Sequence, residues 1–236
     1  MAALVPTRKA ISVAVALSAV ALFFSTGRGD GQEAADFDEA ETCRAVFGTL
    51  ERTHINLLMM PADFEQSVVQ LYLRKLDPRK MYFLREDVAA IRHCARGLQV
   101  QLRRGDLTVV NKSLEIYRNR VRQQTAEARA MLKQEHDFTV DESISLNYRR
   151  RPYCLTEFEL NERWRKTIKY ELLAGRLPDE TREQTIARLQ KRTDRAIANL
   201  EAADREGDVE LFLQAVAQTY DPHSSYLSPT TLDHFR

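Results

Sequence analysis

The arrangement of apolar and polar residues predicts helices over nearly all of the chain after residue 36. Apolar side chains recur there at intervals of three and four residues, which places them on one face of an α-helix. Three such stripes precede residue 106, and the third ends at Gly105, a residue type favoured at helix C-termini. The stripes consist of Phe37, Ala40, Cys43, Phe47, Leu50, His54 and Leu57, then Phe64, Val68, Leu71, Tyr72 and Leu76, and then Val88, Ile91, Cys94, Leu98 and Leu102.

The longest regular pattern follows directly, with Asp106 at the position expected of a helix N-cap. Its members alternate strictly by three and four, and Gln124 is the only polar side chain among them. A seven-residue repeat of this kind fits either an isolated coiled coil or the long arm of an antiparallel bundle. We favour the bundle, because the repeated side chains differ in size. The repeat consists of Leu107, Val110, Leu114, Tyr117, Val121, Gln124, Ala128 and Met131.

The segment 136–153 shows no periodicity and predicts an irregular connection. Such a long connection usually carries function or marks a boundary between subdomains. Three consecutive arginines, residues 149–151, are compatible with an anion site. A solvated loop is the simpler interpretation, because no predicted helix N-terminus or glycine-rich turn accompanies them.

Helical patterns return with Thr156 and Glu159, which form a T-x-x-E capping box at the start of a helix. Trp164, the only tryptophan, is expected to anchor the core. The last main helix is expected to begin at Asp208 and to end at the second of two Asp-Pro pairs. The inward positions of the three predicted helices are Phe158, Leu160, Trp164, Ile168 and Leu172, then Ile186, Leu189, Ile197 and Leu200, and then Val209, Phe212, Leu213, Val216 and Tyr220.

These elements define an all-α fold, a multi-helix bundle of about seven to nine helices. No run of six residues alternates with the period of a strand, and glycine is scarce, with eight residues. We expect one helical domain over residues 36–220, with possible subdomains 36–135 and 154–220 on either side of the irregular connection.

One short pattern occurs in both halves: Asp-Pro, then three residues, then tyrosine. The residue before a proline is disfavoured in the helical region, and aspartate accepts local backbone N–H bonds, so each pair predicts a rigid corner at a helix end. The first copy comprises the structural-corner residues Asp77, Pro78 and Tyr82. The second comprises Asp221, Pro222, His223, Tyr226 and Leu227, and then Ser228 and Pro229, which are expected to begin a short helix.

The N-terminal segment 1–35 has the pattern of a bacterial export signal. Arg8 and Lys9 precede an apolar run, residues 10–24, that only two serines interrupt. A membrane span needs about 20 residues, so the run is short for one. A cleaved signal peptide and an uncleaved anchor both remain open, because no small-x-small cleavage site directly follows Phe24. In either case the remainder is expected to be exported.

Charge and cysteine content narrow the possible partners. Lys plus Arg total 35 and Asp plus Glu total 34, so no excess of charge favours nucleic acid. A protein or peptide partner is more consistent with this balance. The three cysteines, Cys43, Cys94 and Cys154, allow at most one disulfide, and no Cys or His spacing indicates a metal site. We expect them to fill apolar space.

No residue of the sequence is predicted to be catalytic, to bind a cofactor or to bind a metal ion. Asp221, His223, Ser224 and Ser225 are the residue types of a triad, but a triad assembles side chains from separated segments. The chain also lacks a Gly-x-Ser-x-Gly elbow, a His-Glu-x-x-His pair and a glycine-rich phosphate loop. From its own residues, the chain is not predicted to be an enzyme or to need a cofactor.

The run from Asp221 to Pro229 resembles the segment that precedes the PDZ domain in tail-specific (C-terminal-processing) proteases. Similar agreement extends upstream over nearly all of the chain after residue 36. It includes the first Asp-Pro corner, Phe138-Thr139 and Asn147-Tyr148 in the connection, Glu157 through Trp164 with Lys169, and Ala196-Ile197 with Leu200.

The resemblance implies the N-terminal helical domain of a periplasmic serine protease that uses a Ser-Lys dyad. It also implies that unfolded C-terminal tails and a helical-repeat adaptor are the partners, with membrane contact only through an uncleaved N-terminal segment. The PDZ domain and the dyad would lie beyond Arg236, so residues 221–236 become a linker and an interdomain hinge. The alternative is a stand-alone exported helical module that binds without a protease role.

Overall fold

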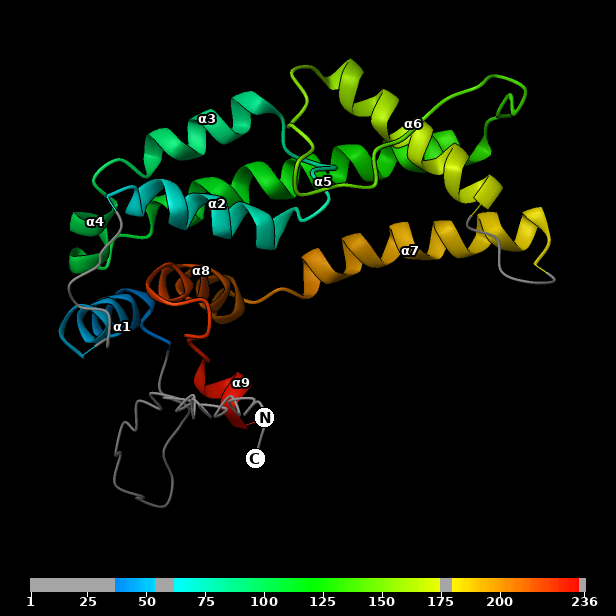
Figure 1. Cartoon of the computed structure of the whole chain (residues 1–236). Coiled ribbons are helices and arrows are strands. Elements are labelled where there is room, and N and C mark those ends of the chain that lie inside the picture. Colours follow the sequence, from blue (N-terminus) through cyan, green and yellow to red (C-terminus); the bar gives the residue numbers. More distant parts are fainter. Residues whose placement is uncertain (1–36, 54–61, 175–179, 234–236) are drawn as a thin grey trace, which may run out of the picture. The chain divides into compact units, whose positions relative to one another are not determined.

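The computed structural model describes residues 37–53, 62–174 and 180–233, and the chain from Asp36 to Arg236 forms one compact unit. Nine helices and no strand occur in these ranges, which confirms the all-α fold (Figure 1). An isolated bridge joins Leu84 to Cys154. The helices are α1 (Glu39–Thr53), α2 (Phe64–Leu76), α3 (Arg85–Cys94), α4 (Leu98–Arg104), α5 (Thr108–Lys133), α6 (Glu157–Ala174), α7 (Arg182–Ala202), α8 (Arg205–Tyr220) and α9 (Pro229–Asp233).

The larger buried cluster gathers apolar side chains from α1 to α4, the beginning of α5, and α8. Tyr72 and Phe212 lie near its centre with their rings edge to face, 5.2 Å between centroids. Because each fully buried large apolar side chain contributes about 1.5–3 kcal/mol, this cluster is the main source of stability. It brings α8, from late in the sequence, against α1 and α2.

A smaller cluster joins the second half of α5 to α6 and α7. It consists of Ala128, Met131, Leu132, Ile168, Leu172 and Leu189. The 26 residues of α5 span about 39 Å at 1.5 Å per residue, so this helix reaches both clusters. Its repeated face is buried, with Tyr117 partly exposed, and it includes Gln124. The long-arm interpretation is therefore correct.

The division into 36–135 and 154–220 stays a prediction, and the buried clusters follow a different grouping. α8 shares its core with α1 and α2, whereas α6 and α7 pack on the far half of α5. Helices that are far apart in the sequence thus contribute to the same hydrophobic core. Sequence periodicity identifies which face of a helix is buried, but not which other helix covers it.

Several predicted helix limits were wrong by a few residues. The third stripe is divided, because Gly97 takes a left-handed φ of 71° between α3 and α4. Gly105 ends α4 as predicted, with a φ of 72°. α8 begins earlier than expected, since Asp204 rather than Asp208 caps it by accepting from Gly207 N at 2.7 Å. Asp208 lies in the first turn and forms an ion pair with Arg118.

The predicted inward face of α6 was wrong at its first turn. Phe158 is 76% exposed, because it lies outside both clusters. Trp164 is only partly buried and packs between the smaller cluster and a third group formed by Leu84, Cys154 and Leu160. The capping box is also altered: Glu159 N donates to Thr156 Oγ1, but Glu159 accepts from Leu155 N instead of Thr156 N.

Residues 1–35 and 54–57 lie outside the described residues, so the export signal and the end of the first stripe stay predictions. Within the described ranges, no helix combines the length and apolarity that crossing a membrane requires. The three cysteines are free thiols, and Cys43 and Cys154 are buried.

Candidate binding groove and the two Asp-Pro corners

The first corner is organised around the carboxylate of Asp77, which is 1% exposed at the end of α2. One oxygen accepts from Met81 N at 2.8 Å, and the other accepts from Tyr82 N at 2.9 Å and Phe83 N at 3.1 Å. The chain reverses at Lys80, whose φ of 49° is unusual for a residue with a side chain. The carboxylate thus satisfies three N–H groups that the turn leaves without helical partners.

Burial and hydrogen bonding act on Asp77 in opposite directions. Burial raises the pKa of this carboxyl, since water no longer solvates its charge. The N–H bonds from Met81, Tyr82 and Phe83 lower the pKa and offset part of the effect. Asp77 is therefore a structural acceptor. The hydrogen bonds from the N–H groups of the turn offset part of the free-energy cost of burying its charge.

Cationic and aromatic side chains from the second half of the chain cover the first corner. Arg163 donates to Lys80 O at 2.7 Å, and Trp164 Nε1 donates to Met81 O at 2.6 Å. Arg151 donates to Arg79 O, while the guanidinium groups of Arg79 and Arg151 lie over the ring of Tyr148 at 5.1 and 4.8 Å. The connection and α6 are thereby fixed to the end of α2.

The second corner is built more lightly. The carboxylate of Asp221, half-buried, accepts from His223 N at 2.7 Å. Pro222 and His223 are exposed, and Leu227 is 39% exposed. Tyr226 returns to the larger cluster, and burial raises its pKa to about 12.

Beyond this corner, two carboxylates of α8 hold the chain. Glu210 accepts from Ser228 N at 3.1 Å and from Thr231 Oγ1 at 2.6 Å, and Glu206 accepts from Thr230 Oγ1 at 2.9 Å. Ser228 caps the short helix α9, whose first residue is Pro229, as predicted. The role of the second corner as an interdomain hinge stays a prediction.

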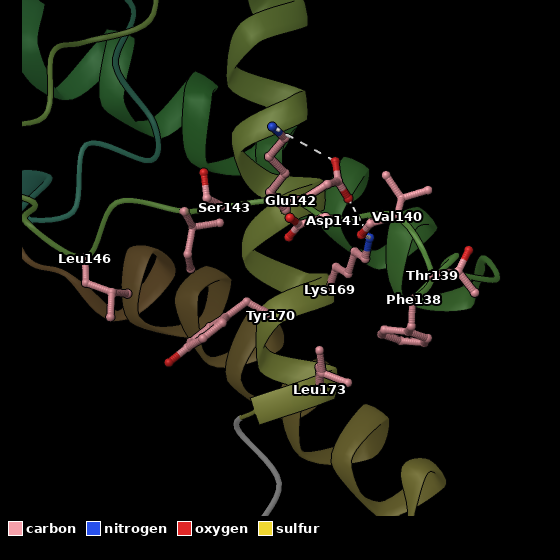
Figure 2. Close-up of a pocket in the computed structure, with 12 residues that line it drawn as sticks. Phe138, Thr139, Val140, Asp141, Glu142, Ser143, Leu146, Lys169, Tyr170 and Leu173 are labelled. Atoms are coloured by element: carbon pink, nitrogen blue, oxygen red, sulfur yellow. Dashed lines mark hydrogen bonds and ion pairs between the residues drawn. The ribbon is translucent and has the colours of Figure 1, made fainter.

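A hollow of about 550 Å³ lies between α6 and the first part of the connection (Figure 2). We call it the groove. Its exposed apolar side chains come from both walls: Phe138, Val140 and Leu146 from the connection, and Tyr170 and Leu173 from α6. Among the described residues, six of the nine large apolar side chains that are notably exposed belong to the connection or α6. Such a concentration of exposed apolar surface is typical of an interaction site.

The irregular wall of the groove is held by an ion cluster. Glu142 accepts from Lys169 Nζ at 2.6 Å (Figure 2), and Lys169 also donates to Val140 O at 3.0 Å. Glu142 accepts from Arg165 as well. The hydrogen bonds from Arg165 and Lys169 lower the pKa of Glu142 to about 2. An acid from the connection therefore ties this wall to α6.

The sequence patterns described above do not predict the groove. Its clearest signal is Leu173, which follows the buried Leu172 and lies one position off the inward stripe of α6. Phe158 is a second example on the same helix. Apolar residues beside a complete inward stripe indicate a second, outward apolar face, and this criterion would have pointed to α6.

The fold and the matched segment define the class to which the chain belongs. The family model described as the tail specific protease N-terminal domain matches residues 46–230. This segment runs from α1 through both corners and the groove to the start of α9. The chain is therefore a member of this family and carries its N-terminal helical domain, which confirms the resemblance.

A relative with a known name agrees with this assignment. The chain is 27% identical over 187 residues to the tail-specific protease of Haemophilus influenzae. The aligned region covers 79% of this chain but 27% of the relative, so the chain spans about a quarter of that protein. The activity of the whole relative belongs to a much longer polypeptide.

Proposed function

We propose that the chain serves as the non-catalytic N-terminal domain of a tail-specific serine protease. In this role it binds unfolded polypeptide along the groove and helps to form the bowl that receives the substrate. The proposal rests on the exposed apolar surface that α6 and the connection form in a domain of this family.

The chemistry of the groove supports an unfolded chain as the ligand. Its apolar side chains would shield those of an extended peptide from water, and such burial contributes about 25 cal/mol per Å². An unfolded polypeptide exposes apolar residues that a folded protein buries. A shallow groove open along α6 can therefore take many sequences, which suits a protease that acts on tails.

We place this function in the periplasm or at the periplasmic face of the inner membrane. The support is the basic pair Arg8-Lys9 and the apolar run of residues 10–24. The neutral charge of the remaining chain agrees with a polypeptide substrate.

Anisotropy of a short fluorescent peptide tests this proposal. The peptide contains Leu, Val, Ser and Thr only and is capped at both ends, so that it has no charge. We expect saturable binding to the full chain, weakened about threefold to tenfold by Leu173→Ser, because about one leucine side chain of apolar contact is lost. Val100→Ser is the matched control, since Val100 is an exposed apolar residue on α4, outside the groove.

The control must bind as the unmodified chain does. Equal affinities for the two variants, or no saturable binding of the neutral peptide, would overturn the groove as the substrate site. Circular dichroism of both variants establishes that they remain folded.

A further inference from the structure

A second hollow of about 300 Å³ lies beside the groove, on the same helix. Both hollows include Ser143, Ile144 and Lys166 among their lining residues, so they are neighbours along one stretch of the connection. The second hollow adds Phe158, whose side chain is exposed, and the basic residues Arg151 and Arg163. We call it the basic hollow.

The arginines of the basic hollow have carbonyl partners but no carboxylate partner among the described residues. Arg163 donates to Lys80 O and to Pro152 O, and Arg151 donates to Arg79 O. Nε of Arg151 is buried and makes no hydrogen bond within the described ranges. Carbonyl oxygens satisfy N–H groups but do not neutralise positive charge.

The acids that line the hollow are already engaged. Glu159 accepts from Leu155 N, and both oxygens of Glu162 accept from Arg165. Lys166 lies at the edge of ion-pair distance from Glu142, at 4.0 Å, and that carboxylate is shared with Lys169 and Arg165. Three cationic residues therefore line the hollow, and Glu159 is the one acid of its lining that has no cationic partner among the described residues, so the lining keeps an excess of positive charge.

The electrostatics of Arg151 agree with this geometry. Burial, and then the neighbouring charges of Arg163 and Arg79, lower the pKa of Arg151. A negative charge placed in the hollow would relieve this repulsion. An arginine at such a site can also offer a carboxylate two parallel N–H bonds.

We infer that the basic hollow is a subsite for the side-chain carboxylate of an Asp or Glu in the polypeptide that lies in the groove. The inference rests on the proposed function and specifies the substrate class: extended segments in which an acidic residue neighbours apolar ones. The apolar residues occupy the groove, and the acid reaches past residues 143–144 to Arg151, Arg163 and Lys166. Phe158 covers the stem of that acidic side chain.

The test compares two capped fluorescent peptides that differ only in one Glu-to-Gln replacement beside the apolar residues. Capping both ends removes the terminal carboxylate, so any effect of charge arises from the side chain. We expect the Glu peptide to bind about threefold to tenfold more tightly at low salt, and the advantage to shrink as salt is added.

The substitution Lys166→Gln should reduce the preference for the Glu peptide, measured as the ratio of the two affinities, because Lys166 also lines the groove and any effect there acts on both peptides alike. Lys191→Gln, at an exposed lysine on α7, should leave both affinities unchanged. Lys166 is chosen because Arg151 and Arg163 also hold the first corner, so their replacement would disturb the fold.

Equal binding of the two peptides, with both still sensitive to Leu173→Ser, would overturn the basic hollow and leave the proposed function intact. Absence of binding by both peptides would overturn the groove itself. A preference that appears only when the C-terminal cap is removed would assign the hollow to the terminal carboxylate and contradict the side-chain subsite.

Discussion

The corners at Asp77 and Asp221 share a sequence pattern and differ in how they are held. Each ends a helix, and each leads to a tyrosine five residues after the aspartate. At the first, one buried carboxylate accepts three backbone N–H bonds, and side chains of the connection and α6 cover the turn. At the second, the half-buried carboxylate accepts from His223 N.

The difference follows from what surrounds each turn. The first corner lies between α2, the connection and α6, so its polar groups lose water and must be satisfied within the protein. The second corner lies at the surface, where Pro222 and His223 are exposed to solvent. The same local motif is therefore a buried turn with many hydrogen bonds at the first corner and an exposed turn with few at the second.

Replacement of each aspartate by alanine should give the largest contrast. Asp77→Ala leaves three N–H groups of the turn without their acceptor, two of them on buried residues, and we expect a loss of about 3–5 kcal/mol in the free energy of unfolding. Asp221→Ala should cost about 1 kcal/mol or less. Urea unfolding followed by circular dichroism measures both. Similar losses at the two positions would remove the distinction between the corners.

The local sequence pattern predicted both corners but not the difference in burial and hydrogen bonding between Asp77 and Asp221. Asp-Pro followed by tyrosine is enough to indicate a helix end and an aromatic contact. The burial of Asp77 depends on Arg163 and Trp164, more than 80 positions away, and no periodicity shows that these residues meet.

The same limit explains the outcome at α6. Periodicity correctly identified Leu160, Ile168 and Leu172 as buried, because a helix buries one stripe. It placed Phe158 inside as well, although Phe158 precedes Leu160 by only two residues and therefore lies on the opposite side of α6 from that stripe. The groove was missed because its other wall, residues 138–146, has no period to analyse.

Glu210→Gln should have an intermediate effect, concentrated at the second corner. Oε2 of the carboxylate accepts from Ser228 N and Thr231 Oγ1, and Oε1 accepts from Gln214 Nε2. The amide nitrogen of a glutamine would therefore face a donor in either orientation. We expect a loss of about 1–2 kcal/mol in global stability. Limited proteolysis should become faster between residues 221 and 231 and stay unchanged at the first corner.

The control for this variant is Glu115→Gln, at an exposed carboxylate on α5. It should alter neither the stability nor the cleavage pattern. If Glu210→Gln leaves proteolysis at the second corner unchanged, the carboxylate of Glu210 does not hold the segment from Ser228 to Thr231 in place.

The smallest effect should be a dependence on pH of residues 138–146, the groove wall that precedes the residues covering the first corner. Ion pairs lower the pKa of Glu142 from its ordinary 4.5 to about 2, so the folded state holds this proton less tightly than the unfolded state. Its contribution to stability is therefore complete above about pH 4.5 and is lost as the pH falls towards 2. Hydrogen exchange of residues 138–146 should increase over this window.

The second corner provides the internal comparison, because the hydrogen bonds and ion pairs of Glu142 within the described residues are with α6 and not with this corner. In Glu142→Gln, residues 138–146 should exchange faster already at neutral pH and show little further change on acidification. A wild-type profile in this variant would mean that the ion pairs of Glu142 do not hold residues 138–146. Acid that loosens both corners equally would mean that the whole domain opens rather than this segment alone.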